Sequence, residues 1–288
     1  MNRKPSSERH PLNAPGDWFI DTRCIDCGAS RTLGPGLVAA RGGQSVFARQ
    51  PETGADRLLA WRARLVCPTA SVRSESREVT PAGVFPEELA PGVFRLGYNA
   101  RSSFGAHSFG VRRTSGNLMV DSPRWTRQVV AVFEGWGGLA DILLSHRDDV
   151  ADAGKYAIHF GARVWIHEAD RDAAPYAECT VRGRNPVQLY PDVLALPVPG
   201  HTEGSTIYLF ANRFLFTGDS LAWSFERGTL TAFRDACWYS WEEQTRSLRK
   251  LLEYPFEWVL AGHGASHGAP ATEMRAHLTG LLAWMESS

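Results

Sequence analysis

Hydrophobic and polar positions follow patterns that change along the chain, and the changes divide it into parts. Residues 1–16 are rich in proline, serine and charge and predict a flexible tail. Residues 17–72 begin with the strand-like WFIDT, contain a short apolar strand at residues 45–47, and lead into a helix at about residues 53–66, where leucine and tryptophan recur at helical spacing. This helix is expected to end at Cys67, because a proline disfavours helical conformation in the residue before it. A polar linker is predicted at residues 73–82.

The last part, residues 83–288, opens with short β-like segments separated by glycine, serine and asparagine turns. Apolar strands then alternate with helices. We expect helices at about residues 125–136, 149–160 and 241–252 and at the C-terminus, and strands at 142–144, 163–166, 193–196, 206–210, 213–216 and 258–260. This order is typical of an α+β domain in which helices flank two sheets.

Charge and composition mainly exclude classes of function. Lys plus Arg and Asp plus Glu both number 31, so the formal net charge is zero and gives no electrostatic reason to expect nucleic acid or an anionic membrane as a partner. The apolar runs are too short to span a bilayer. The polar N-terminus has no apolar stretch behind it, so we expect no signal peptide and a cytoplasmic protein. The five cysteines are an odd number, which argues against a disulfide framework.

Polar side chains follow four of the predicted strands at the point where each strand ends. They are His146, Asp148 and Asp149 in LLSHRDD, His201 in PVPGHTEGS, Asp219 in LFTGDS and His263 in VLAGHG. Strand ends bring side chains together on a rigid scaffold, and zinc and iron accept imidazole nitrogen and carboxylate oxygen as ligands, so these segments predict a metal site. A single histidine at a strand end more often packs or makes a hydrogen bond. The prediction therefore rests on the combination of four segments.

In this order and spacing the segments resemble the motifs of the metallo-β-lactamase superfamily over roughly residues 84–285. VDSPR resembles its early aspartate-containing strand end, GHTEGS the loop of the middle histidine, FTGDS the loop of the metal-bridging aspartate, and GHG the loop of the last histidine. The resemblance implies an αββα sandwich and metal-dependent hydrolysis, with the metal ligands His146, Asp148, His201, Asp219 and His263. It does not imply the substrate, because the fold hosts many chemistries.

The first motif departs from the family pattern His-x-His-x-Asp-His. Asp148 stands in place of the second histidine, and Val150 and Ala151 stand in place of the aspartate and the third histidine. Because the lost residues usually serve the second metal, we expect one zinc or iron ion rather than two. As an anionic ligand, Asp148 would weaken the activation of the catalytic water. Asp149 or Asp152 is the candidate for a substitute catalytic base; alternatively, both lie in the solvated first turn of a helix.

The N-terminal part resembles a ferredoxin-type iron–sulfur segment, and metallo-β-lactamase-like proteins with such a segment form a recognised subfamily. Cys24 and Cys27 have C-x2-C spacing and Cys67 precedes a proline, but Ser30 stands in place of the third cysteine of the run. A four-iron cluster with Ser30 or solvent as the fourth ligand, a three-iron cluster held by the cysteines alone, and a packing domain without a cluster all remain open. Cys24 and Cys27 are alternatively a zinc pair or free thiols.

Three functional hypotheses follow from these observations. The leading one is a metal-dependent hydrolase that cleaves a thioester, phosphoester or lactam bond in a small-molecule substrate. The second is an iron-dependent redox protein that uses the iron–sulfur cluster and an electron-transfer partner. The third is a non-catalytic binding or sensor protein that has lost metal ligands.

Overall fold

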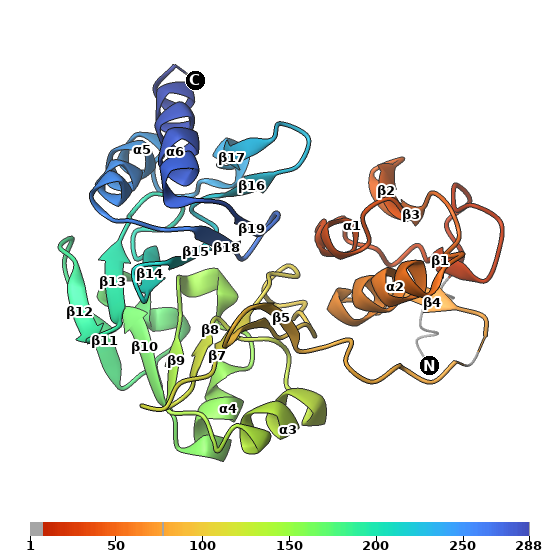
Figure 1. The fold of residues 1–288 in the computed structure, drawn as a ribbon, viewed down its shortest axis with the longest axis horizontal. Helices are drawn as coiled ribbons and strands as arrows, with labels where there is room; N and C mark the ends of the chain where they lie inside the picture. Colours follow the sequence, from red (N-terminus) through yellow and green to blue (C-terminus); the bar gives the residue numbers. More distant parts are fainter. Residues whose placement is uncertain (1–7, 77, 288) are drawn as a thin grey trace.

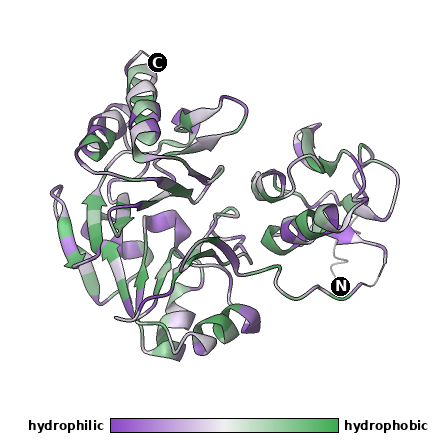
Figure 2. Cartoon of the chain, in the orientation of Figure 1, coloured by the Kyte–Doolittle hydropathy of each residue, from purple (hydrophilic) through white to green (hydrophobic). Residues whose placement is uncertain are grey.

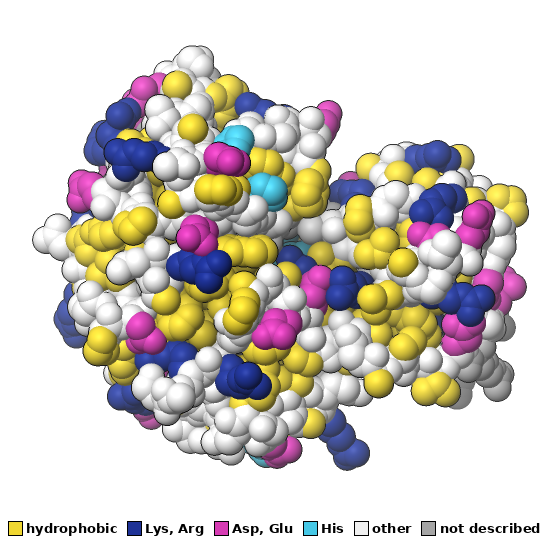
Figure 3. Space-filling view, viewed as in Figure 1, with side chains coloured by type: hydrophobic (Ala, Val, Ile, Leu, Met, Phe, Trp, Pro, Cys, Tyr) yellow, Lys and Arg dark blue, Asp and Glu magenta, His cyan; other side chains and the backbone are white. Residues whose placement is uncertain are grey.

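The computed structural model describes residues 8–76 and 78–287 of the chain. They form a small N-terminal domain and a larger C-terminal domain that lie side by side (Figure 1). In the space-filling view the small domain is a separate lobe against the larger one, and side chains of both charges are scattered over the visible face rather than gathered by sign (Figure 3).

The N-terminal domain packs helix α2 against short strands. Its elements are β1 (Trp18–Ile20), α1 (Ala29–Leu33), β2 (Val38–Arg41), β3 (Gln44–Phe47), α2 (Gly54–Val66) and β4 (Val72–Ser74). Thr53 and Asp56 form a capping box at the start of α2, where each side chain accepts a hydrogen bond from the other residue's backbone N–H. The helix ends at Val66, with Cys67 as its C-cap in extended conformation, so the predicted helix is confirmed.

Two expectations for this domain need correction. Residues 8–16 are not a flexible tail, because the His10 N–H donates to the Ile20 carbonyl at 3.0 Å and the Asn13 amide contacts β1 and β3. Residues 1–7 lie outside the described residues. The linker begins later than residue 73, because Arg73 and Ser74 pair with β1 in an antiparallel ladder. Their polar side chains conceal the strand in the sequence.

The C-terminal domain contains two mixed sheets that pack face to face. One has the strand order β11-β10-β9-β8-β7-β6-β5 and the other the order β12-β13-β14-β15-β18-β19. The first comprises β5 (Glu87–Ala90), β6 (Val93–Arg95), β7 (Phe109–Val111), β8 (Leu118–Val120), β9 (Asp141–Leu143), β10 (Arg163–His167) and β11 (Cys179–Val181). The second comprises β12 (Val187–Tyr190), β13 (Val193–Pro197), β14 (Thr206–Phe210), β15 (Phe214–Gly218), β18 (Trp258–Ala261) and β19 (His267–Gly268), and the hairpin β16 (Ala222–Ser224) and β17 (Thr229–Thr231) lies beside it.

Helices cover the outer face of each sheet. Helices α3 (Arg127–Gly135) and α4 (Ala153–Phe160) pack on the first sheet, and α5 (Trp241–Leu248) and α6 (Ala271–Glu286) pack on the second. A third apolar core fills the space between the sheets, with residues such as Phe109 and Phe216 in contact at a ring distance of 5.6 Å. The central strands are accordingly hydrophobic along their length (Figure 2). The predicted α+β class and αββα sandwich are confirmed.

The helix predicted at residues 149–160 is interrupted near its start. A 3-10 helix covers Arg147–Asp149, and α4 begins only at Ala153. Ala151 lies between them with φ 34°, a left-handed conformation that a continuous right-handed helix excludes. The interruption turns Asp149 and Asp152 in different directions. In the described part of the chain, no helix combines the length and apolar character needed to cross a membrane.

Polar contacts join the two domains. Arg124, just before α3, donates from its guanidinium to the carbonyls of Leu65 and Cys67, each at 3.4 Å. Arg62 of α2 pairs with Glu87 of β5 at 2.7 Å. The N-terminal domain is therefore held against the C-terminal one by more than the linker.

Candidate metal centre

The four predicted segments meet at one edge of the sandwich. His146 follows β9, His201 follows β13, Asp219 directly follows β15 and His263 follows β18. Because β15 and β18 are parallel neighbours, their carboxyl ends bring Asp219 and His263 together. A parallel pairing of β8 and β9 places His146 at the end of the other sheet.

The two imidazoles each lie close to two carboxylates. His146 Nε2 is 3.9 Å from Asp148 Oδ2 and 3.7 Å from Asp219 Oδ2. His201 Nε2 is 3.4 Å from Asp148 Oδ2 and 3.7 Å from Asp219 Oδ2. Tetrahedral zinc with bonds near 2 Å separates neighbouring donor atoms by roughly 3.3–3.6 Å. Each imidazole therefore lies near this distance from both carboxylates, and His146, Asp148 and His201 form one group whose ligand atoms all lie within 4.8 Å of one another.

Asp149 joins this set from the interrupted helix. Its side chain is buried, and a ligand atom of Asp149 lies within 4.8 Å of ligand atoms of His146 and Asp219. Gly262 makes the approach of the two carboxylates feasible, since a Cβ there would lie 2.8 Å from Asp219 Oδ1 and 2.9 Å from Asp149 Oδ2. We call the five residues His146, Asp148, Asp149, His201 and Asp219 the His/Asp centre.

The fit to a metal shows most clearly in the buried atoms that have no partner. His146 Nε2, His201 Nε2 and both oxygens of Asp149 are buried without a hydrogen bond in the structure. A buried polar atom without a partner costs about 1–3 kcal/mol, and a charged one costs more. These atoms belong to two groups of possible ligands that share His146, and a cation bound there would explain why they have no other partner.

Neighbouring side chains orient these ligands. Ser145 Oγ lies 2.9 Å from His146 Nδ1 and donates to Asp121 Oδ2, while the Ser145 N–H donates to Asp121 Oδ1. This leaves Nε2 of His146 directed toward the centre. On the other side, Asp170 accepts from the Arg147 N–H and the Thr202 hydroxyl and so ties the 3-10 helix to the His201 loop.

The charges of the centre depend strongly on one another. Burial, with Asp219 and Asp121 nearby, raises the pKa of Asp149 well above its usual range. Burial acts the same way on Asp219, but the imidazoles of His263 and His146 outweigh it and hold its pKa low. Burial lowers the pKa of His146 to about 4, which favours the neutral form that binds metal.

The two remaining predicted site residues of this domain, Asp152 and His263, make other contacts. The Asp152 carboxylate accepts from the Trp125 N–H at 2.6 Å and pairs with Lys155 at 2.7 Å. It is therefore engaged outside the His/Asp centre, and of the two candidate bases only Asp149 lies in that centre. His263 is in the site, but its Nδ1 contacts Asp219 Oδ2 at 2.8 Å and its Nε2 lies 3.3 Å from the Phe104 carbonyl oxygen.

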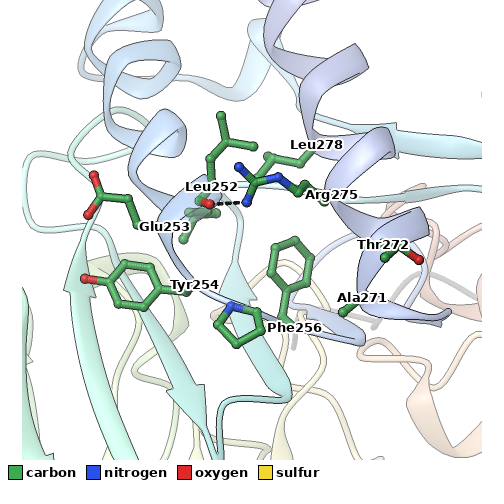
Figure 4. A pocket seen from close by; sticks show the side chains of 10 residues that line it. Leu252, Glu253, Tyr254, Phe256, Ala271, Thr272, Arg275 and Leu278 are labelled. Carbon is green, nitrogen blue, oxygen red and sulfur yellow. Dashed lines mark hydrogen bonds between the residues drawn. The ribbon is translucent and has the colours of Figure 1, made fainter.

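Two cavities on the surface differ in the residues that line them. One, of about 400 Å³, opens at Asp148 and is lined by Arg147, Glu203, Trp238 and Tyr239, and Trp238 is 68% exposed. The other, of about 300 Å³, lies where the chain after α5 meets α6 (Figure 4). There the Arg275 guanidinium donates a hydrogen bond to the Leu252 carbonyl. Only the first cavity borders the His/Asp centre.

The three predicted cysteines gather in the N-terminal domain, and we call Cys24, Cys27 and Cys67 the cysteine site. Burial, with smaller contributions from Cys67 and Cys24, raises the pKa of Cys27 to about 11, so the three thiols influence one another. Backbone N–H groups donate to Cys24 Sγ at 3.4 Å and to Cys67 Sγ at 3.2 Å. Such N–H bonds to sulfur are a feature of iron–sulfur sites.

Ser30 does not join the cysteines in the manner that a fourth ligand would need. It is buried, and its hydroxyl donates to the Ala63 carbonyl at 3.1 Å, so it packs α1 against α2. Ligation by Ser30 would require that hydrogen bond to break.

Several residues of the site were not among the sequence predictions. Ser145 and Asp170 orient ligands, and Gly262 admits the carboxylates, but each becomes meaningful only beside a partner far away in the chain. Only Asp121 gave a signal, because it lies in the VDSPR segment at the end of an apolar strand.

Solved structures with similar folds include several metallo-β-lactamases. The DIM-1 metallo-β-lactamase exposed to ceftazidime has a TM-score of 0.53 and 17% identity, with 70% of this chain and 96% of that one covered. BLEG-1, a B3 metallo-β-lactamase, gives 0.52 and 16% over 66% of this chain and 99% of that one. A metallo-β-lactamase from Hirschia baltica gives 0.51 and 15%, covering 67% and 96%. At these identities the likeness establishes the fold.

Sequence comparisons address the N-terminal domain. Residues 20–74 match the family model for the 4Fe-4S single cluster domain of Ferredoxin I. No curated protein sequence gives a significant match to the chain. The protein thus combines a segment that matches the single-cluster ferredoxin family with a C-terminal domain that has the metallo-β-lactamase fold.

Proposed function

We propose that the protein is a metal-dependent hydrolase whose metal ion is held by His146, His201, Asp148 and Asp219. The observation that carries the proposal is the approach of both imidazole Nε2 atoms to Asp148 Oδ2 and Asp219 Oδ2 at 3.4–3.9 Å, with both Nε2 atoms buried and unpartnered. This ligand chemistry suits zinc or iron.

One ion is favoured over two. His146 belongs to both groups of residues that could hold an ion in residues 8–76 and 78–287. Ser145 occupies its Nδ1, so only Nε2 is left to bind. The nitrogens of His263, the remaining predicted ligand, contact Asp219 and the Phe104 carbonyl. In this arrangement His263 orients Asp219.

The residues around the ion would divide the chemistry between them. A bound ion supplies Lewis-acid chemistry and lowers the pKa of a water ligand to roughly 7. Asp149, whose carboxylate faces the centre beside Asp219, is placed to accept the proton of the attacking water. Asp148 carries a negative charge at the cavity mouth, and Trp238 and Tyr239 form the wall that a small substrate would contact.

The test combines metal analysis with hydrolysis assays. Wild-type protein should bind about one zinc or iron ion at the His/Asp centre per chain and hydrolyse at least one compound in a panel of chromogenic thioesters, phosphoesters and lactams. His201→Ala and Asp219→Asn should lose both properties, whereas His277→Ala, which changes a histidine that contacts Thr229, should keep them. Variants with unchanged metal content and activity would rule the centre out.

A redox function is the second candidate, and the cysteine site favours it. Three thiols, of which Cys24 and Cys67 accept N–H bonds at sulfur, adjoin a domain that offers an iron-compatible centre. An electron-transfer partner would then supply or receive electrons at the cluster. Protein purified without oxygen should contain both iron and acid-labile sulfide, and its visible absorption should bleach when dithionite is added. Colourless protein without sulfide would exclude this function.

A further inference from the structure

A loop of the C-terminal domain lies against the cysteine site. We call residues 99–107, between β6 and β7, the bridging loop. Its Gly105 has φ 87°, and a Cβ at this position would lie 2.8 Å from Cys27 Sγ and 3.2 Å from a Pro68 side-chain carbon. Only glycine therefore lets the loop approach the sulfur so closely.

Phe104, the residue before Gly105, contacts His263 beside the His/Asp centre. The Phe104 carbonyl oxygen lies 3.3 Å from His263 Nε2, and His263 Nδ1 contacts Asp219 Oδ2 at 2.8 Å. The His107 N–H donates to the Gly262 carbonyl at 2.8 Å, which fixes the loop to the residue beside His263. Two consecutive loop residues thus contact the cysteine site and the surroundings of the metal ligand Asp219.

Internal hydrogen bonds make the bridging loop a stiff connection. The Asn99 amide donates to the Gly105 carbonyl at 2.6 Å, and both residues are buried. The Asn99 carbonyl accepts from Arg124 at 2.9 Å, and Arg124 also donates to the Cys67 carbonyl. A displacement of Cys27 or Cys67 would therefore move the loop as a unit, because packed, hydrogen-bonded elements transmit small shifts.

We infer that the bridging loop couples the cysteine site to the His/Asp centre, so that a cluster bound by the cysteines tightens metal binding at the centre. The inference rests on the proposed function for the two cofactors and adds the link between them. A cluster orders Cys27 and, through Gly105, the Phe104 carbonyl that positions His263 and Asp219. Metal then binds a centre that is already ordered. By linkage, metal at the centre favours the cluster to the same extent.

The test measures metal affinity with and without a cluster. The full chain is prepared without oxygen, either free of iron or reconstituted with iron and sulfide, and titrated with Co²⁺ followed by its visible absorption difference. The Co²⁺ dissociation constant should be at least about fivefold lower in the reconstituted protein, the lower end of typical coupling between sites. No activity measurement is needed.

Two glycine variants distinguish a steric clash with Cys27 from the effect of backbone strain. Gly105→Ala should abolish the fivefold effect, whereas Gly83→Ala, with a similar φ of 75° and nothing within 4 Å of the new Cβ, should keep it. If Gly105→Ala does not fold, Arg124→Lys loosens the same connection from the Cys67 side and should reduce the effect.

The possible results distinguish the link from the proposed function. Equal Co²⁺ affinity in wild-type protein with and without a cluster overturns the coupling and leaves both cofactors in place. A protein that takes up no cluster, or no metal at the His/Asp centre, overturns the coupling together with the proposal on which it rests. A coupling that survives in Gly105→Ala and Arg124→Lys alike assigns it to another route and overturns the role of the loop.

Discussion

The His/Asp centre and the cysteine site are built differently, and the difference determines how plainly each can be recognised. The His/Asp centre lies at the ends of central strands, and it holds buried nitrogen and oxygen atoms without partners. The cysteine site lies on loops around two helices, and its sulfurs have modest contacts with backbone N–H groups. Unpartnered imidazole and carboxylate atoms are costly when buried, whereas a thiol behaves as a small apolar group.

Buried oxygen and nitrogen atoms without partners therefore carry a desolvation cost that buried thiols largely avoid. Geometry alone argues strongly for metal at the first centre. At the second, the argument needs the sequence pattern and the match to a ferredoxin family as well. Four substitutions test whether this contrast holds.

The largest effect is expected at Cys67. Cys67→Ala removes one of three thiolates, and a cluster with two protein ligands should not survive purification, so iron and acid-labile sulfide should fall to background. Cys179→Ala, on β11 of the other domain, serves as the control and should retain both. Equal iron content in the two variants would show that the cysteine site holds no cluster.

At the His/Asp centre, Asp148→Ala should weaken metal binding by at least about 100-fold, because even residues that only orient ligands contribute about 10–100-fold. Asp152→Ala is the matched comparison on the same segment. It should leave affinity unchanged, since its carboxylate contacts Trp125 and Lys155. Isothermal titration with zinc measures both, and a larger loss in Asp152→Ala would reverse our assignment.

Ser145→Ala should weaken metal binding by about tenfold, since it removes the hydroxyl between Asp121 and His146 Nδ1. Ser108→Ala removes another buried hydroxyl, but one that has no hydrogen-bond partner in the structure, and it should have no effect on affinity. The same zinc titration applies. An unchanged affinity in Ser145→Ala would mean that His146 is held in place by packing alone.

The smallest effect is expected at Ser30. Ser30→Ala loses the hydrogen bond to Ala63 and should lower the free energy of unfolding by about 1 kcal/mol, measured by urea denaturation. The iron content should be unchanged, because the hydroxyl is engaged away from the sulfurs. Loss of iron in this variant would instead make Ser30 a ligand.

The sequence predicted the centre better than the details around it. Strands such as β15 and β18 are short apolar runs, so the residues after them, including Asp219 and His263, could be placed at one edge. The choice between Asp149 and Asp152 could not be made, because it depends on the left-handed Ala151, a residue that ordinarily favours helix. The role of Gly105 was invisible, since its reason lies in Cys27 of the other domain.

The polar bridges between the domains have a consequence for proteolysis. Val79 is 88% exposed in the linker, where a protease could cut. Cleavage there would not separate the two fragments, because Arg62 still forms an ion pair with Glu87 and Arg124 still donates to the Cys67 carbonyl. The two fragments should migrate apart on a denaturing gel yet elute as a single particle in gel filtration, and halves expressed separately should reassemble by complementation.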